Sequence, residues 1–246
     1  MSLRLRVATY NIHSCVGIDK QCNPERTLAV LREIDADIYA LQEVGGNPVS
    51  SEIDQFHFFD RHLGMKAVAG PNLRRRSPFG NAVFAKWDIG AIKLIDLSVS
   101  PFEPRGAIDC AIDVQGTGIR IIATHLGLFP HEREQQLRRL GTALQTEEQP
   151  LTIFMGDFNI FGPERRKLRR LGAPAQLPKL RSFPSRRPLM SLDRIWSVPN
   201  SNIATIHVHK TTLAHAASDH LPLVAEIVID VDAMAEKTAQ NELSPV

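Results

Sequence analysis

Hydrophobic residues along this chain fall mostly into short runs separated by charged or turn-forming residues. Near the N-terminus Leu3, Leu5 and Val7 alternate with polar or small residues, which predicts a first β-strand. Between two later runs, Gly116-Thr-Gly118 predicts a hairpin turn. Runs of similar length predict the remaining strands at Asp37–Gln42, Asn81–Ala85, Ile89–Leu97, Ala107–Val114, Ile119–Thr124, Leu151–Met155, Leu192–Ser197, Ala204–His209 and Leu221–Ile229.

Helical spacing of apolar residues is confined to a few segments. Asn23-Pro24 provides an N-cap and a first-turn proline for a helix with Leu28, Leu31 and Ile34 along one side. The other predicted helices are Ser50–Leu63, Pro130–Leu144 and Pro163–Leu171.

The order of these elements gives more strand–strand hairpins than strand–helix–strand crossovers. This favours an α/β (α+β) fold in which two packed mixed sheets have helices on their outer sides. No Gly- or Ser-rich linker divides the chain, so we expect one domain over residues 1–230. The Ala-, Glu- and Gln-rich segment 231–246 is expected to be a loose or short helical tail.

Composition excludes several classes of protein. With 246 residues, 43% of them hydrophobic, and a net charge of +2, the chain is suited to a globular fold and not to disorder. It has no apolar run of membrane-spanning length and no apolar segment typical of a secretion signal near its first residues. The three cysteines lack the spacing of a zinc site or a disulfide framework. We therefore expect a cytoplasmic location.

Positive charge is concentrated in one stretch. Residues 163–187 contain nine Lys or Arg residues and a single acidic residue, Glu164, which gives a net charge of +8 and leaves −6 for the rest of the chain. Such a stretch is either a solvated basic surface or a binding site for a phosphate-rich partner. Arg74-Arg75-Arg76, outside this stretch, could join the same surface together with Arg186-Arg187 within it.

Polar residues that can bind metal or phosphate follow or precede the apolar runs repeatedly. Any one of them is most simply a turn former, a helix cap or a satisfied polar residue. Together they supply carboxylates, amides and histidines at strand ends, a set of ligands that suits Mg²⁺ or Mn²⁺ better than zinc or copper. The nucleotide-binding, zinc-protease and serine-hydrolase motifs G-x-x-x-x-G-K-[ST], G-x-G-x-x-G, H-E-x-x-H and G-x-S-x-G are missing.

Six short motifs with such residues follow one another along the chain: Thr9-Tyr-Asn11, Leu41-Gln-Glu43, Thr124-His125-Leu, Gly156-Asp157-Phe-Asn159, Leu192-Asp193-Arg-Ile and Ser218-Asp219-His220-Leu-Pro222. This ordered set resembles the endonuclease/exonuclease/phosphatase superfamily, which includes deoxyribonuclease I, abasic-site endonucleases, neutral sphingomyelinases, inositol-polyphosphate phosphatases and tyrosyl-DNA phosphodiesterases. The resemblance extends from Asn11 to Pro222 and implies a four-layered sandwich of two mixed sheets flanked by helices, with the site at one edge of the sheets.

The resemblance also implies a metal site and a group that activates water. Glu43 and Asn11 would bind an essential Mg²⁺ (or Mn²⁺), with Asp219 completing the metal site or the polar cluster around it. A hard cation there would neutralise phosphate charge and polarise the P–O bond. Asp157 would orient or deprotonate the attacking water, and Asn159 would hold that water or a phosphate oxygen.

The remaining roles implied by the resemblance concern the phosphate. His220 would contact it as an acid, a base or a stabilising cation, and Asp193 would orient His220. His125 matches the phosphate-contacting histidine of the deoxyribonuclease and sphingomyelinase branches. Arg105, before the strand Ala107–Val114, is either a substrate-binding arginine or an exposed loop residue.

These features predict a Mg²⁺-dependent phosphoesterase, foremost a phosphodiesterase or endonuclease. Abasic-site enzymes carry a Gly-Tyr-Ser-Gly-type segment and lack histidine at the position of His125, so the presence of His125 and of Phe79-Gly-Asn-Ala-Val-Phe84 makes that branch less favoured. A hydrolase of phospholipid headgroups is an alternative, with an anionic lipid in place of a nucleic acid as partner. A catalytically silent binding domain of the same fold is a third hypothesis. The oligomeric state is not predicted.

Overall fold

The computed structural model of the protein describes residues 2–45, 54–74, 79–144 and 151–230. Its strands form a six-stranded sheet in the order β10-β11-β1-β2-β4-β3 and a five-stranded sheet in the order β5-β6-β7-β8-β9. The strands are β1 (Ser2–Asn11), β2 (Ile38–Val44), β3 (Lys66–Ala69), β4 (Gly80–Ala85), β5 (Ile89–Asp96), β6 (Gly106–Val114), β7 (Thr117–His125), β8 (Thr152–Asp157), β9 (Asp193–Val198), β10 (Ile203–Val208) and β11 (Leu223–Asp230).

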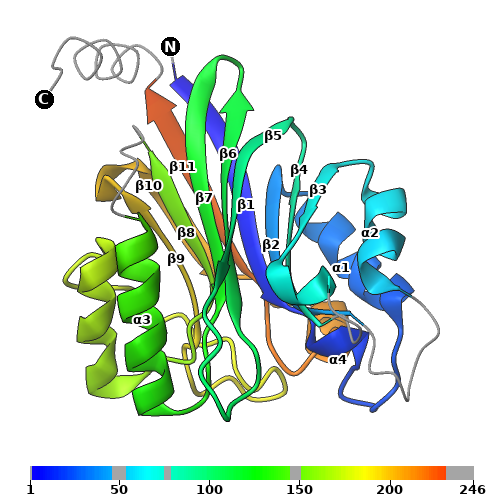
Figure 1. The fold of residues 1–246 in the computed structure, drawn as a ribbon. Helices are drawn as coiled ribbons and strands as arrows, with labels where there is room; N and C mark the ends of the chain where they lie inside the picture. Colours follow the sequence, from blue (N-terminus) through cyan, green and yellow to red (C-terminus); the bar gives the residue numbers. More distant parts are fainter. Residues whose placement is uncertain (1, 46–53, 75–78, 145–150, 231–246) are drawn as a thin grey trace, which may run out of the picture.

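Helices cover the outer side of each sheet, which gives four layers (Figure 1). The helices α1 (Pro24–Ile34), α2 (Gln55–Leu63) and α4 (Thr212–Ala217) pack on the six-stranded sheet. The helix α3 (Pro130–Leu144) and the 3₁₀ segment η3 (Gly162–Leu171) pack on the five-stranded sheet. The short 3₁₀ segments are η1 (His13–Cys15), η2 (Pro71–Arg74) and η4 (Asn200–Asn202). The predicted sandwich of two mixed sheets flanked by helices is confirmed.

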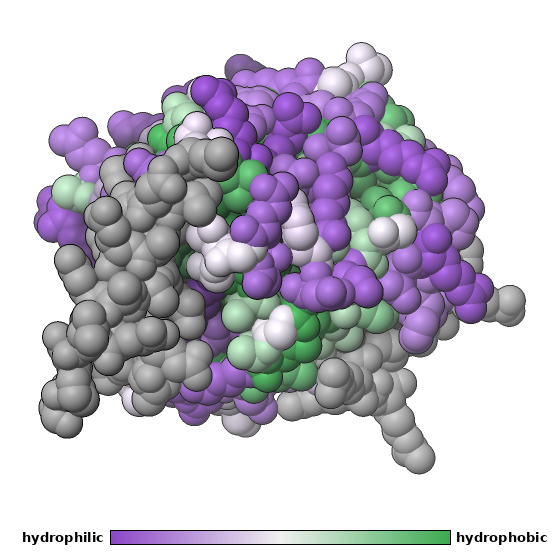
Figure 2. Space-filling view, turned by 90° about the horizontal axis from the view of Figure 1, so that it is seen from above, coloured by the Kyte–Doolittle hydropathy of each residue, from purple (hydrophilic) through white to green (hydrophobic). Residues whose placement is uncertain are grey.

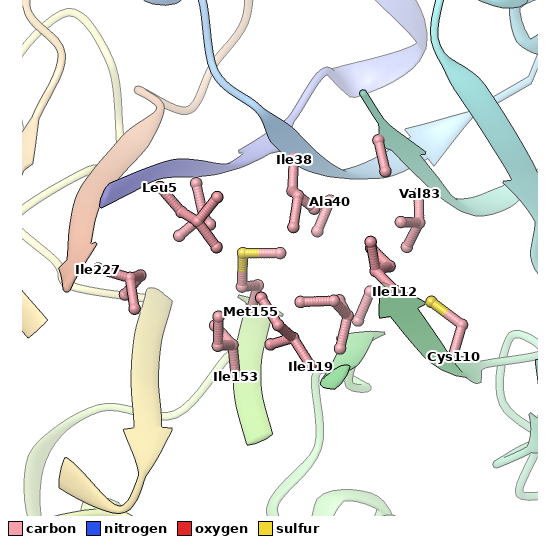
Figure 3. Packing of buried hydrophobic residues seen from close by; sticks show 14 of the residues in the cluster. Leu5, Ile38, Ala40, Val83, Cys110, Ile112, Ile119, Ile153, Met155 and Ile227 are labelled. Atoms are coloured by element: carbon pink, nitrogen blue, oxygen red, sulfur yellow. The ribbon is translucent and has the colours of Figure 1, made fainter. Parts of the chain in front are cut away.

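The central core lies between the two sheets and is almost entirely aliphatic (Figure 3). Because successive strand residues point to opposite faces, Ile38 of β2 enters this core while Tyr39 packs against the outer helices. In β8, Ile153 and Met155 enter it while Phe154 faces α3 and η3. Strands buried on both faces explain why the sequence shows continuous apolar runs rather than strict alternation.

Most predicted elements are present, and the differences have local causes. The predicted turn Gly116-Thr-Gly118 is wrong by one position, because Thr117 already pairs with Val114. The turn residues are Gln115 and Gly116, with φ of 53° and 84°, as a two-residue hairpin with positive φ at both positions requires. Of the predicted helix Ser50–Leu63, the part from Gln55 is helical, and residues 50–53 lie outside the described residues.

The strand β3 and the helix α4 were not predicted, because four and six residues are too few to show a period. The predicted helix Pro163–Leu171 is a 3₁₀ helix rather than an α-helix, and its buried residues are Leu168 and Leu171, as expected. The tail predicted at 231–246 lies outside the described residues. Within the part of the chain that is described, no helix combines the length and the apolar character needed to cross a bilayer.

The direction of the strands determines where their polar ends meet. The strands β1, β2, β7 and β8 all run toward the lower end of the sandwich in Figure 1, whereas β9 and β11 begin there. The motifs singled out in the sequence therefore lie together at this lower end. The upper end, seen in Figure 2, is covered mainly by hydrophilic residues, with hydrophobic residues visible only in patches among them.

Candidate active site

Four neighbouring strands of the five-stranded sheet place candidate residues in one row. Gly106 pairs with His125, His125 with Asp157, and Asp157 with Asp193. Arg105 directly precedes Gly106. Arg105 lies next to the first member of this row, and Asp193 is its last member. The register of the sheet therefore brings together residues that are 88 positions apart in the sequence.

The six-stranded sheet contributes Asn11 and Glu43. Asn11 is the last residue of β1, and Glu43 lies where the pairing of β2 with β4 shifts register between Leu41 and Val44. Glu43 has a φ of +55°, a conformation that is uncommon for residues other than glycine and is often found at functional sites. The irregularity re-aims the Glu43 side chain toward the site, as β-bulges commonly do.

The amide of Asn11 joins the two sheets. Its Nδ2 donates to Oε1 of Glu43 at 2.9 Å and to Oδ2 of Asp157 at 3.2 Å. Asn11 and Asp157 are both almost completely buried. Ser218 donates to the backbone carbonyl of Asn11 at 2.8 Å, which ties the loop before His220 to the same point.

A tight turn after β8 holds Asp157 and Asn159. A Cβ atom on Gly156 would lie 2.0 Å from the carbonyl oxygen of Thr124, so only glycine permits this close approach of β7 and β8. The backbone N–H of Asn159, which has a φ of +50°, donates to Oδ1 of Asp157 at 2.9 Å. The side-chain amide of Asn159 donates to the carbonyl of Leu126 at 2.9 Å, which fixes its position beside His125.

His220 is held by two carboxylates. Its Nδ1 lies 2.9 Å from Oδ2 of Asp193, and its Nε2 lies 3.7 Å from Oδ2 of Asp157. Burial disfavours the charged imidazolium, but Asp193 and Asp157 outweigh this and raise the pKa of His220 to about 10. The ring also packs against Phe183, with the ring centroids 4.7 Å apart. His220 is thus a cation at neutral pH.

His125 has the opposite surroundings. The guanidinium of Arg105 lies with Nη1 2.7 Å from Nδ1 of His125, and Nε2 of His125 lies 3.5 Å from Oδ2 of Asp157. Burial, the positive charge of Arg105 and that of His220 together lower the pKa of His125 well below its ordinary value. Donor groups face both ring nitrogens, since Nη1 of Arg105 also lies 3.1 Å from Nε2 and Nδ2 of Asn159 lies 3.2 Å from Nε2.

Asp157 is the point at which these side chains converge. Its Oδ2 atom lies within 3.7 Å of Asn11, His125 and His220, which come from three separate elements. Burial, and then the nearby charge of Asp193, raise the pKa of Asp157 to about 6. It is therefore mostly ionised at neutral pH yet able to accept a proton.

The structure sharpens the interpretation of two predicted residues, Arg105 and Asp219. Arg105 is not an exposed loop residue: 6% of it is exposed, and Nη2 donates to Glu103 at 3.0 Å. Asp219 lies farther from the centre, with its side chain 39% exposed and 3.7 Å from Nδ1 of His13. The structure therefore brings eight of the nine candidates into one buried or half-buried cluster and leaves Asp219 at its rim.

The donor atoms of the cluster fit a divalent cation. Asp157, Asp193 and His220 each have one potential ligand atom within 4.8 Å of the others, and His220 can act as a ligand only as the neutral imidazole. Oδ1 of Asp193 is buried and has no hydrogen-bond partner among the described residues. With Glu43 and Asn11 linked to Asp157, the site is rich in oxygen ligands, which hard cations such as Mg²⁺ prefer.

Several supporting residues were not found from the sequence. Ser182 donates to Oδ2 of Asp193, and Phe183 packs on His220, from a loop that has no regular pattern. Asn81 and Asn72 lie beside Arg105 and His125, and each has a buried amide oxygen without a hydrogen-bond partner among the described residues. A buried asparagine within the apolar run Asn81–Ala85 was the available signal for Asn81.

The fold and this arrangement of carboxylates, amides and histidines define a class of phosphoesterase-like sandwich proteins. The chain belongs to the Endonuclease/Exonuclease/phosphatase family, whose sequence profile it matches over residues 8–220. The resemblance inferred from the motifs is thereby confirmed.

Individual relatives add to this result. The chain is 29% identical, over an alignment of 248 positions, to the uncharacterized protein YbhP of Escherichia coli K12, covering 90% of this chain and 95% of that protein. A family protein from Bacteroides thetaiotaomicron superposes with a TM-score of 0.74 at 16% identity, over 95% of this chain and 98% of that one. Truncated TDP2 of Caenorhabditis elegans gives 0.66 at 16% identity, over 92% and 98%. At such identities the structural matches show the shared fold alone.

Proposed function

We propose that the protein is a metal-dependent phosphodiesterase that acts on nucleic acid. The observation that carries this proposal is the convergence of Asn11, His125 and His220 on Oδ2 of Asp157. A carboxylate with its pKa raised to about 6, beside an imidazolium, is a proton acceptor next to a cation. When water attacks a phosphodiester, a proton acceptor can take the proton of the water and a cation can stabilise the negative charge that develops on the phosphate.

Each side chain has a role that its surroundings support. Asp157 orients the attacking water and accepts its proton, while Asn159 holds the water or a phosphate oxygen. Arg105 and His220 supply positive charge for the phosphate, which becomes more negative as the water attacks. His125 remains neutral and lies beside Arg105 and Asn159, and Asp193 positions His220 through Nδ1.

The resemblance of the motifs points to Mg²⁺ or Mn²⁺ as cofactor, and Glu43 and Asn11 are the residues that would hold it, with Asp219 at the rim. When bound, such a cation neutralises phosphate charge and polarises the P–O bond. The amide of Asn11 already connects Glu43 to Asp157, so this chain holds the oxygen ligands and the water-activating carboxylate in one fixed arrangement.

The test is hydrolysis of bis(p-nitrophenyl) phosphate and nicking of supercoiled plasmid, each with Mg²⁺ or Mn²⁺ and with a chelator. Asp157→Asn keeps the size of the side chain and removes the proton acceptor, so we expect a loss of about 10³-fold in kcat. The matched control is Asp113→Asn, in an exposed residue at the β6–β7 turn whose side chain accepts from Gly116 N–H.

Activity in the wild type and in Asp113→Asn that disappears with the chelator and in Asp157→Asn would support the proposal. Hydrolysis of sphingomyelin or another phospholipid without plasmid nicking would favour the headgroup hydrolase instead. A folded wild-type protein that hydrolyses none of these phosphate esters would contradict the proposed activity and leave a silent binding domain of the same fold.

A further inference from the structure

A second cationic feature lies outside the cluster described above. A pocket of about 640 Å³ opens between η3 and the loop that follows it. Four of its lining residues are cations, Arg165, Arg166, Arg169 and Lys179, and none is acidic. This volume lies within the range of ordinary ligand pockets.

The 3₁₀ geometry of η3 separates two kinds of positive charge. With three residues per turn, residues at i and i+3 lie directly above one another. Glu164, Lys167 and Arg170 therefore form one ridge, and they pair with one another or with α3: Lys167 lies 2.9 Å from Glu164 and 3.3 Å from Glu134, and Arg170 also pairs with Glu134. The positive charge on this ridge is neutralised.

The neighbouring ridge carries Arg166 and Arg169, which face the pocket. In the described part of the chain neither these two residues nor Lys179 has a carboxylate partner, and Arg165 donates to the backbone carbonyl of Gly162 at 3.1 Å. Cations held close together without counter-charges repel one another, so the arrangement favours an anionic ligand. The planar fork of arginine matches the oxygens of a phosphate group.

The pocket is close to the candidate active site along the chain. Gly162, at the edge of the pocket, is three residues beyond Asn159, so their Cα atoms are at most ~10 Å apart. Nη2 of Arg194 donates to the carbonyl of Ile160 at 3.3 Å, which ties the connecting segment to β9 beside Asp193. Because successive phosphates on one strand of a duplex rise by about 3.4 Å, a nucleic-acid strand can reach both places.

We propose that this pocket is a second phosphate-binding site that holds the backbone of a nucleic-acid strand a few phosphates away from the one at Asp157. The assignment of its ligand rests on the proposed phosphodiesterase function, but it concerns binding and involves none of the residues assigned to the reaction. A nucleic-acid strand presents several phosphates in succession, so it can offer one phosphate to Asp157 and another to the pocket.

The test measures binding of fluorescent single-stranded and duplex oligonucleotides by anisotropy, in chelator and over a range of salt concentrations. The variant is Arg166→Gln/Arg169→Gln/Lys179→Gln, which removes the unpaired charges and leaves the ridge paired with α3 intact. If each cation contacts a phosphate, the slope of log K against log[salt] falls in magnitude by about 2 to 3, and affinity at low salt falls at least about 10-fold.

The matched control is Arg4→Gln/Arg61→Gln/Lys210→Gln, which removes three exposed cations from other surfaces and should change binding little. Arg166→Lys/Arg169→Lys keeps the charge and should retain most of the salt slope, which excludes loss of folding as the cause. Hydrolysis of bis(p-nitrophenyl) phosphate should be the same in the triple variant and in the wild type, because that small substrate does not reach the pocket.

The proposal is overturned if the wild type does not bind oligonucleotides, or if the triple variant loses no more affinity and salt slope than the control. It is also overturned if the triple variant loses binding to anionic phospholipid vesicles while its binding to oligonucleotides is unchanged. Since the measurement uses chelator and needs no turnover, an inactive Asp157 site does not affect its outcome.

Discussion

The two histidines of the candidate active site occupy equally buried positions and yet differ in charge. On one side of Asp157, Arg105 directly before β6 lies against His125 at the end of β7. On the other, Asp193 at the start of β9 binds His220 in the loop before β11. The pKa of His125 lies well below its ordinary value, whereas that of His220 is raised to about 10.

The difference in charge between the two rings comes from their neighbours, because burial acts in the same direction on both. Burial disfavours the imidazolium in both places. Arg105 adds to that effect, and Asp193 and Asp157 overcome it. One side of Asp157 therefore has a neutral imidazole and the other has an imidazolium.

Among variants that change the surroundings of one histidine, Asp193→Asn should have the largest effect, because it removes the charge that holds His220 as a cation. We expect kcat toward a phosphodiester to fall about 10²- to 10³-fold, since His220 loses both its orientation and its proton. In metal-free protein, the NMR titration of His220 should move from about 10 toward the ordinary value near 6.5. Activity that needs the imidazolium should then be lost at a lower pH, because a raised pKa keeps the proton on the ring only up to that pKa.

Asp109→Asn is a useful comparison, because Asp109 is a buried carboxylate of β6 paired with Arg120 and is not part of the site. It should reduce stability and leave the titration of His220 unchanged. An unchanged pKa of His220 in Asp193→Asn would show that Asp193 does not keep His220 charged.

A smaller effect is expected from Arg105→Gln. Removing the guanidinium should raise the pKa of His125 toward its ordinary value, although burial and His220 still oppose the charged form. We expect about a 10-fold loss in kcat/KM, as one charge-assisted contact to phosphate is removed. NMR titration of His125 in the metal-free variant measures the shift, and no change there would mean that burial alone keeps the ring neutral.

The smallest effect is expected from replacing Glu134, which forms ion pairs with Arg138, Lys167 and Arg170 at the protein surface. Hydrogen bonds from Arg170, and also from Arg138 and Lys167, outweigh desolvation and lower the pKa of Glu134 to about 2. A carboxyl with a lowered pKa contributes stability above its unfolded pKa of about 4.5 and loses that contribution as pH falls toward 2.

Glu134→Gln should therefore reduce the free energy of unfolding by about 1 kcal/mol at pH 7, and by nothing near pH 2. Urea unfolding at both pH values measures this difference. A loss of equal size at both pH values would indicate that Glu134 acts through packing rather than charge. Because solvent screens the ion pairs of Glu134, we expect Glu134→Gln to change the protein less than the substitutions beside His125 and His220 do.

Much of the fold follows from local sequence. Leu5 and Val7 of β1 and the capped helix beginning at Pro24 were predicted, because period and caps are properties of neighbouring residues. The candidate residues were found for a similar reason: Asp157 and Asn159 stand directly after a buried run. The missed elements are short, as β3 is, or depend on distant contacts, as the loop carrying Ser182 and Phe183 does.

The basic stretch illustrates the limit of such reasoning. The nine cations of residues 163–187 can be counted in the sequence. The sequence does not show whether all nine lie on one uniform surface. The 3₁₀ geometry of η3 turns Lys167 and Arg170 toward Glu134 of α3 and leaves Arg166 and Arg169 facing the pocket. A helix of 3.6 residues per turn would have distributed the same charges differently.

Local period and ordered motifs were enough to predict the class of fold, the family and the candidate residues. Which of those residues meet at Oδ2 of Asp157, and which charge His125 and His220 carry, depends on contacts between distant parts of the chain. The physical reason is that a pKa depends on burial and on charges a few ångströms away. Those neighbours, Arg105 and Asp193, lie 20 and 27 positions from the histidines they control.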